Sequence, residues 1–460
     1  MEQLPGSDAI FLAMDTDTVY AHVGALTVLD PSDAPNFSFA RVRELTDERV
    51  RDIPRFTQKL RSVPLDLDRP YLVEDPHFNV DNHLHRIAVP SPGSMRELGE
   101  LAGLLYARHL DRRRPLWEAW FIEGLEGGKV ALLVKTHHCL IDGASGAGLG
   151  EMLFDIEPNP APRKPAAKAP RKPPAPEPSD WVLAARGLLS AMSTPRRMTR
   201  YGFQLARQFG VMLPYLRDSA MTAFTGVPQV SFNAPIGPRR AMACASVPLG
   251  DVKDVKKHFD VKLNDVVLEL TASSVRRYLK ARKELPKESL AVAIAVSTRA
   301  EGDATLGNQV STIFVSWATD IEDPADRLLQ IHKNVSKAKE MEKALRASEI
   351  QAIGDTAPPR LINLAWRALL AAHVPPPANL MVSNVPGPLF PLYTAGARIE
   401  CMYPMSILAP GNGLNVTVIS YRGRIDFGFT VDPELIPDPW LLAEGIPLAL
   451  AELKQRAGIA

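Results

Sequence analysis

Two adjacent histidines, His137 and His138, are the residues best suited to acid–base chemistry in this chain. They follow an apolar run, residues 130–134, that is long enough for a buried strand. A histidine at a strand end, exposed to a cleft, can take a proton from a hydroxyl near neutral pH. Because neighbouring side chains on a strand point to opposite faces, we expect one histidine to face a cleft and the other to be held in the core.

Asp142 and Gly143 follow the histidines closely in the sequence. Asp142 can accept a hydrogen bond or pair with a cation, and either contact would fix the loop that carries the base. Gly143 begins a run of small residues, so a substrate chain can approach the backbone there. A helix beginning in this run would also offer free N–H groups.

A metal site and a phosphate-binding loop are competing interpretations of the same stretch. Adjacent histidines on a strand diverge, and the chain has no HExxH motif and no paired CxxC motif. Gly146, Gly148 and Gly150 follow the strand, but a dinucleotide fingerprint needs its third glycine at the position of Glu151. Cys139 is either a thiol nucleophile or a packing residue. We expect no metal and no bound cofactor.

Several motifs resemble those of one enzyme family. Residues 137–143 read HHCLIDG and match the HHxxxDG motif of the CoA-dependent acyltransferase superfamily. Pro115, Leu116 and Trp117 match a PLW motif, and Asn264 with Asp265 matches an ND motif. SNVPGP, which begins with Ser383 and Asn384, SDAIFL near the N-terminus and SYRGRIDFGFTVD near the C-terminus also match. In this combination the chain resembles the bacterial wax ester synthase/diacylglycerol acyltransferase family along nearly its whole length.

The resemblance implies a fold and a reaction. The fold would be two α/β sandwiches like chloramphenicol acetyltransferase, facing each other across a substrate tunnel. Acyl-CoA would be the co-substrate, and the hydroxyl of diacylglycerol or of a long-chain alcohol would accept the acyl group. His138 would act as general base and His137 would be structural. Asp142 would hold the loop through an ion pair, with Arg299 as partner or, failing that, Arg360 or Arg398.

The remaining motifs each have a structural alternative. The spacing predicts a helix over residues 263–282, so Asn264 or Asp265 either caps its first turn or contacts substrate. SNVPGP is either a rigid turn or, through Ser383 and Asn384, a substrate contact. Donors for the oxyanion stay open between Asn264, the Ser383–Asn384 pair and backbone N–H groups near Gly143.

Length and composition favour a large intracellular protein with more than one domain. The chain has 460 residues, 46% of them hydrophobic, and its net charge of +1 gives no reason to expect a nucleic-acid partner. Three widely spaced cysteines fit a reducing compartment, and neither a signal peptide nor a membrane-spanning run is expected. Strands and helices alternate irregularly, which predicts α+β mixed sheets. We divide the chain into an acyltransferase domain (1–155), a linker region (156–229) and a second acyltransferase-like domain (230–460).

The linker region is proline-rich and basic. Nine prolines fall within residues 157–178, and residues 161–220 carry a net charge of +8. Apolar residues interleave with the arginines after residue 180, so these helices either lie on an anionic membrane or pack on the two domains. We expect a cytoplasmic protein at the surface of the inner membrane or of lipid droplets.

Two alternative functions stay open at this point. One is a related acyltransferase that acts on a polyketide or glycolipid alcohol from a carrier-bound donor. The other is a non-catalytic protein that binds lipid surfaces, although the intact HHxxxDG motif argues against it.

Overall fold

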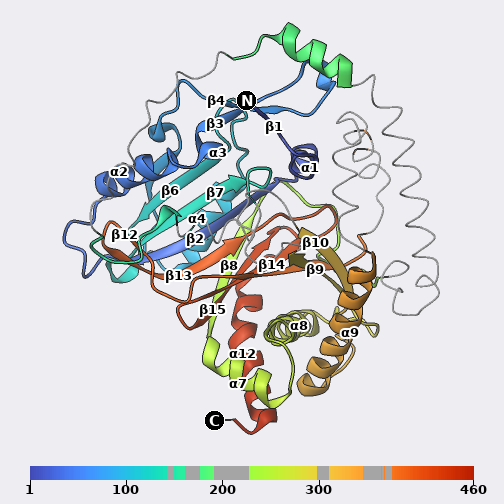
Figure 1. Cartoon of the computed structure of the whole chain (residues 1–460). Helices are drawn as coiled ribbons and strands as arrows, with labels where there is room; N and C mark the ends of the chain where they lie inside the picture. Colours follow the sequence, from blue (N-terminus) through green and yellow to red (C-terminus); the bar gives the residue numbers. More distant parts are fainter. Residues whose placement is uncertain are drawn as a thin grey trace.

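The computed structural model describes residues 1–141, 150, 152–160, 177–190, 227–297, 310–345, 364, 367 and 376–459. Within this part of the chain, most strands belong to two six-stranded mixed sheets, with a smaller three-stranded sheet near the N-terminus (Figure 1). The expected class, a mixed α/β protein with mixed sheets, is confirmed.

The first large sheet carries the two histidines. Its strand order is β12 (Tyr393–Thr394), β13 (Ala397–Met405), β2 (His22–Asp30), β7 (Val130–His137), β6 (Trp117–Glu123) and β5 (Leu84–Ala88). β7 pairs antiparallel with β2 and β6, and β5 runs parallel to β6. The predicted strand before the histidines therefore lies in the middle of this sheet, and His137 is its last residue.

The second large sheet is built from the later part of the chain. Its order is β10 (Val310–Ser316), β9 (Ala291–Ser297), β11 (Leu380–Pro386), β14 (Leu414–Tyr421), β15 (Arg424–Val431) and β8 (Ala241–Pro248). β11 runs parallel to both β9 and β14. The helices of this half are α7 (Leu249–His258), α8 (Leu263–Ala281), α9 (Pro324–Leu345) and α12 (Trp440–Ala457), which pack beside one another and on the sheet (Figure 1).

The sheets do not follow the order of the chain completely. β12 and β13 come from the C-terminal part of the sequence but lie in the first sheet, where β13 pairs antiparallel with β2. β13 also packs against β14 and β15 of the second sheet. The two halves are therefore tied together by an exchanged segment, and the three residue ranges predicted as domains stay a prediction.

Helices cover both faces of the first sheet. α2 (Phe39–Val50) and α3 (Pro54–Thr57) contribute Val42, Val50 and Phe56 to a core on one side. On the other side, α4 (Met95–Tyr106) lies between the sheet and β8 of the second half. Its Gly99 and Gly103 face the β8 backbone so closely that a Cβ at either would lie 2.5 Å from a carbonyl oxygen.

Short elements complete the N-terminal half. α1 (Gly6–Met14) precedes β2, and the small sheet has the order β1 (Glu2–Gln3), β4 (Tyr71–Glu74) and β3 (Gln58–Arg61). Three 3₁₀ turns, η1 (Pro64–Asp66), η2 (Val80–Asn82) and η3 (Glu126–Gly128), connect strands. Among the described residues, no helix is long and apolar enough to cross a membrane.

Candidate active site

His137 is fixed by hydrogen bonds at its backbone and at both ring nitrogens. Its N–H donates to the Leu116 carbonyl (2.9 Å), and its buried ring accepts the Cys139 N–H at Nδ1 (3.1 Å). Because Nδ1 accepts, the proton lies on Nε2, which donates to Asp15 Oδ2 at 3.1 Å. Burial lowers the pKa of His137, so the neutral form is favoured. This arrangement leaves His137 no nitrogen for a substrate.

Asp15 closes the end of α1 and receives three donors. Its Oδ1 accepts the Ala21 N–H at 2.7 Å, and its Oδ2 lies 3.0 Å from Arg112 Nη2 as well as close to His137. Burial alone would raise the pKa of Asp15, but the hydrogen bonds from His137 and Ala21 lower it well below its usual range. Asp15 is therefore an ionised carboxylate beside the histidine pair.

His138 follows β7 and contacts α1. Its backbone N–H donates to the Ala21 carbonyl (2.7 Å). Its half-buried ring stacks on Phe11, with ring centroids 3.9 Å apart and planes 9° from parallel. The stacked contact limits the ring to one plane, so the backbone and one face of His138 are both held by residues from outside the motif.

A buried ion pair supports the next residue of the turn. Arg55 Nη1 donates to the Leu140 carbonyl and to Asp8 Oδ2, both at 3.1 Å. Asp8 comes from α1 and is fully buried. Asp142, Gly143 and Arg299 lie outside the described residues, so the predicted Asp142–Arg299 ion pair stays a prediction.

Arg398, one of the alternative partners for Asp142, lies at the end of β2 that is farther from the histidines. It pairs with Asp30 at 3.5 Å, at the end of β2, whereas His22 at the start of β2 lies opposite His137. Nine residues of extended strand separate the two ends, a length of about 25 Å. Because Asp142 lies outside the described residues, a pairing of Arg398 with Asp142 stays a prediction.

The PLW residues lie in the core. Pro115, Leu116 and Trp117 are buried, and Trp117 Nε1 donates to the Phe56 carbonyl at 2.9 Å. Leu116 supplies the carbonyl that fixes the His137 backbone. These contacts support a packing and positioning role, and substrate binding by the three residues stays a prediction.

The ND and SNVPGP motifs meet in the second half. Asn384 Nδ2, on β11, donates to Asn264 Oδ1 at the start of α8 (3.3 Å). The neighbouring Asp265 accepts the Lys262 N–H (2.9 Å) and lies 2.6 Å from His332 Nδ1, so it caps the helix as expected from the sequence. Ser383, beside Asn384 on β11, pairs in register with Thr417 of β14.

Sequence reasoning missed the residues that surround the histidines: Phe11, Asp15, Arg55 and Arg112. Asp15 lies 122 positions from His137, and Arg55 lies 85 positions from Leu140. No spacing rule joins such distant residues. The available signal was the SDAIFL motif, whose last residues include Phe11 and whose helix leads to Asp15.

No described group of side chains has the composition of a metal site, since no three His, Cys, Asp or Glu residues of the described ranges gather suitably. Cys139 is fully buried, and burial raises its pKa well above the usual range. It therefore stays protonated, which favours packing over nucleophilic chemistry.

Comparison with solved structures first defines the class of fold. A condensation domain of the calcium-dependent antibiotic synthetase aligns with a TM-score of 0.58 and 16% identity, covering 99% of this chain and 96% of that one. This likeness shows that the chain shares the fold of condensation domains. The wax ester synthase/diacylglycerol acyltransferase of Marinobacter aquaeolei aligns with a TM-score of 0.72 and 26% identity over the full length of both chains.

Sequence comparisons then identify the family. Residues 4–267 match the wax ester synthase/diacylglycerol acyltransferase catalytic domain, and residues 306–454 match the C-terminal domain of the same family. A protein of Mycobacterium tuberculosis with a provisional diacylglycerol O-acyltransferase name is 35% identical, covering 98% of this chain and 90% of its own. A "probable" diacylglycerol O-acyltransferase of the same species is 32% identical over the full length of both. The chain belongs to the wax ester synthase/diacylglycerol acyltransferase family, which confirms the expected acyltransferase class.

Proposed function

We propose that the protein transfers a long-chain acyl group from acyl-CoA to the hydroxyl of diacylglycerol or a long-chain alcohol, with His138 as general base. The observation that carries this assignment is that His137 has no ring nitrogen left for a substrate, which leaves the base of the motif to His138. Both ring nitrogens of His137 are occupied by Asp15 and by the Cys139 N–H. His138 is the second histidine of the HHxxxDG motif, and one face of its ring stacks on Phe11.

The reaction needs one proton carrier and no enzyme nucleophile. His138 takes the proton from the acceptor hydroxyl while the hydroxyl oxygen attacks the thioester carbonyl. The C–S bond then breaks, and the imidazolium returns the proton to the CoA thiolate. Acyl-CoA is a co-substrate in this scheme, and no further cofactor enters it.

Asn264 and Asn384 are our candidates for binding the substrate or the oxyanion. Their side chains meet at 3.3 Å, and each is half-buried. Because Asn384 Nδ2 has two hydrogens, one can bond to Asn264 while the other is offered to a substrate oxygen. Asn384→Ala removes this donor, so we expect a loss of kcat of about 100-fold with little change in melting temperature.

A product assay tests the reaction and the base together. Purified protein receives labelled palmitoyl-CoA with either dioleoylglycerol or hexadecanol, and neutral lipids are separated by thin-layer chromatography. We expect triacylglycerol or wax ester from the wild type, and a loss of at least about 100-fold in His138→Ala. His77→Ala is the matched control, since His77 is an exposed histidine on the same half.

The outcomes separate the alternatives. The ratio of the two products ranks the acceptors. Absence of both products from wild-type protein would favour a carrier-bound donor or a non-catalytic role. Equal activity in His138→Ala and wild type would remove His138 as base while leaving the family's reaction intact.

We also propose that residues 180–190 dock the enzyme on a lipid surface, where its water-insoluble acceptors gather. This segment is helical, and its apolar side chains point outward: Trp181 is 86% exposed, Leu188 59% and Leu189 68%. The opposite face holds Leu183, which is fully buried, and Gly187, which lies against Val63. An outward apolar stripe with a tryptophan is typical of helices that lie in a membrane interface.

Ion pairs fix this helix on the N-terminal half. Arg61 Nε lies 3.2 Å from Glu177, and Lys59 Nζ lies 3.4 Å from the same carboxylate. Leu65, on the turn beside this helix, is 73% exposed and extends the apolar surface. The positive charge of residues 161–220 would strengthen contact with anionic lipids.

Vesicle sedimentation tests the lipid surface. We expect wild-type protein to sediment with phosphatidylcholine–phosphatidylglycerol vesicles, and Leu188→Ser/Leu189→Ser to stay in the supernatant with unchanged activity on detergent-dispersed substrate. Leu441→Ser/Leu448→Ser is the control, because these leucines of α12 are exposed to a similar degree on the other half. Equal sedimentation of both variants would reject this docking surface.

A further inference from the structure

The Asp15 carboxylate reaches the backbone on both sides of His138. On one side, Asp15 Oδ1 accepts the Ala21 N–H, and the Ala21 carbonyl accepts the His138 N–H. On the other side, Asp15 Oδ2 accepts from His137 Nε2, and His137 Nδ1 accepts the Cys139 N–H. Each path joins the carboxylate to the turn through one intervening residue.

We propose that Asp15 is a positioning residue for the reaction, held in place by Arg112, and that it fixes His138 through His137 and Ala21. This inference rests on the proposed role of His138 as base. Asp15 is joined to α1, the helix whose Phe11 also stacks on the His138 ring. The helix end therefore sets the ring plane and the backbone of the base together, which is the preorganisation that acid–base catalysis needs.

Both oxygens of the Asp15 carboxylate are needed as hydrogen-bond acceptors. A carboxylate accepts from both His137 and Ala21, whereas an asparagine can accept from only one of them. In Asp15→Asn the amide NH₂ would face either the Ala21 N–H or His137 Nε2–H. The second arrangement forces the His137 proton to Nδ1, where it would oppose the Cys139 N–H. Either orientation sets two donors against each other.

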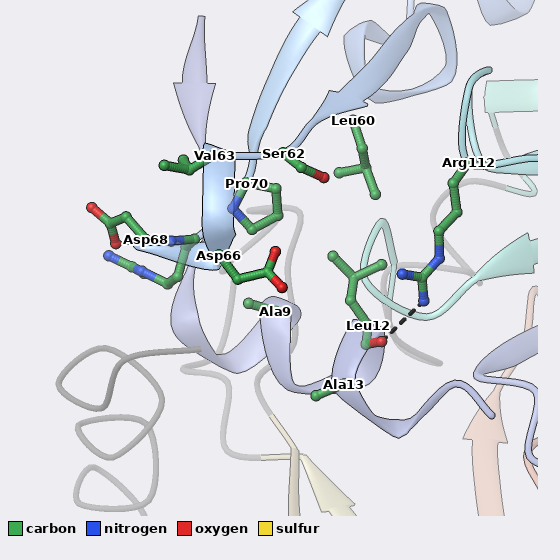
Figure 2. Close-up of a pocket in the computed structure, with 11 residues that line it drawn as sticks. Ala9, Leu12, Ala13, Leu60, Ser62, Val63, Asp66, Asp68, Pro70 and Arg112 are labelled. Carbon is green, nitrogen blue, oxygen red and sulfur yellow. Dashed lines mark hydrogen bonds between the residues drawn. The ribbon is translucent and has the colours of Figure 1, made fainter. Parts of the chain in front are cut away.

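Arg112 completes the arrangement from the solvent side. Its Nη2 donates to Asp15 Oδ2 and to the Leu12 carbonyl, both at 3.0 Å. Figure 2 shows its guanidinium beside Leu12, and both residues line a cavity of about 170 Å³. Asp66 and Asp68 line the same cavity from the turn at η1. Arg112 therefore lines this cavity and also contacts the Asp15 carboxylate.

Kinetics of near-isosteric variants give the first test. We expect Asp15→Asn to lower kcat about 100-fold, the cost of misplacing a reacting group by about 1 Å, while KM for acyl-CoA changes less than about twofold. Asp17→Asn is the matched control, because Asp17 is exposed on the same segment. A kcat for Asp15→Asn equal to that of wild type would overturn the proposal.

Chemical rescue distinguishes positioning from a general loss of structure. Arg112→Ala should lose kcat and regain it when guanidinium is added at about 50 mM, far below the molar concentrations that unfold proteins. Arg113→Ala, its neighbour, pairs only with Asp111 among the described contacts and should show neither the loss nor the rescue. A loss that guanidinium leaves unchanged would reject the assigned role of Arg112.

One measurement does not depend on activity. In protein labelled with ¹⁵N-histidine, His137 should show the Nε2–H tautomer in wild type, and this signature should be altered in Asp15→Asn. An Nδ1–H tautomer in wild type would overturn the positioning geometry even if the enzyme is active. An inactive wild type with the Nε2–H tautomer would reject the proposed reaction and leave the arrangement around Asp15 standing.

Discussion

The two halves of the molecule use buried charge differently. In the first half, the carboxylates of Asp8 and Asp15 are buried beside the histidine turn, and each acts through a partner on a backbone group of that turn. In the second half, Glu269 and Arg327 pair at 2.8 Å and join α8 to α9. The first arrangement orders a loop, and the second orders two helices. The Arg55–Asp8 and Arg327–Glu269 pairs are both buried, but the first supports a loop and the second supports the packing of two helices.

This difference shows where precision is needed. The second half has the largest apolar core, and its buried pair adds a fixed contact between helices that already pack together. The strand hydrogen bonds of β7 hold the chain up to His137, but the turn that follows, residues 138–140, has no regular secondary structure. Hydrogen bonds from α1 and from Arg55 hold this turn instead. We expect loss of a pair to cost stability in both halves but catalysis in only one.

Matched arginine variants are the strongest way to break this comparison. Arg55→Met removes the ion pair between Arg55 and the buried Asp8 carboxylate, and Arg327→Met removes the ion pair with Glu269, so each should lose about 3–5 kcal/mol of unfolding free energy. At a temperature where both variants are folded, Arg327→Met should keep near wild-type kcat. Arg55→Met should lose kcat at least about tenfold because the Leu140 carbonyl is released.

Denaturant unfolding and steady-state kinetics on the same samples check this prediction. Double variants that also remove the carboxylate, Asp8→Leu with Arg55→Met and Glu269→Leu with Arg327→Met, should recover stability in both halves. The Asp8→Leu/Arg55→Met enzyme should keep its low kcat, because the Leu140 carbonyl still lacks the Arg55 donor. An Arg55→Met enzyme with normal kcat would show that the turn is held well enough without the pair.

The sequence predicted the elements of both halves better than the contacts between them. The apolar run at residues 130–134 gave β7, and the helical spacing of residues 263–282 gave α8, because these signals are local. The exchange of β13 into the first sheet was missed, since pairing between β2 and β13 joins segments far apart in the chain. The same limit applies to the site. HHCLIDG marked His137 and His138, but Asp15 gave no local signal.

A glycine at the junction of the halves gives a smaller effect. In Gly103→Ala, the new Cβ would lie 2.5 Å from the Arg240 carbonyl oxygen and 2.7 Å from Ala241 Cα, both on backbone that cannot move alone. We expect a loss of about 1–3 kcal/mol of unfolding free energy, the usual range for overpacking. Gly250→Ala in α7 is the control, because its Cβ would meet open space.

Thermal melts compare the two glycine variants. Gly250→Ala should be unchanged or up to about 1 kcal/mol more stable, since alanine restricts the unfolded chain. If Gly103→Ala also melts normally, α4 and β8 can separate without cost, and the halves are less tightly joined than their close approach implies. A single transition at lower temperature would show that the junction belongs to one cooperative unit.

The smallest expected effect is a difference between the two halves in how the unfolding free energy depends on pH. His22 is fully buried opposite His137, and its pKa is lowered well below 6.5 by burial and by the nearby positive charge of Lys135, which Asp15 only partly offsets. Below about pH 6.5, His22 is therefore protonated in the unfolded chain but stays neutral in the folded chain. Unfolding free energy should fall as the pH drops below about 6.5, by up to about 1.4 kcal/mol per pH unit.

The sign differs in the second half, where burial raises the pKa of Asp426 on β15. A raised carboxyl pKa gives stability at low pH that is lost as the pH rises through the folded value, so Asp426 cannot cause acid sensitivity. Denaturant unfolding at pH 7.5 and 5.5 should show a smaller acid loss in His22→Leu than in wild type, with His258→Gln as the exposed control. An equal acid loss in all three proteins would place the sensitivity elsewhere, with His137 as the next group to test.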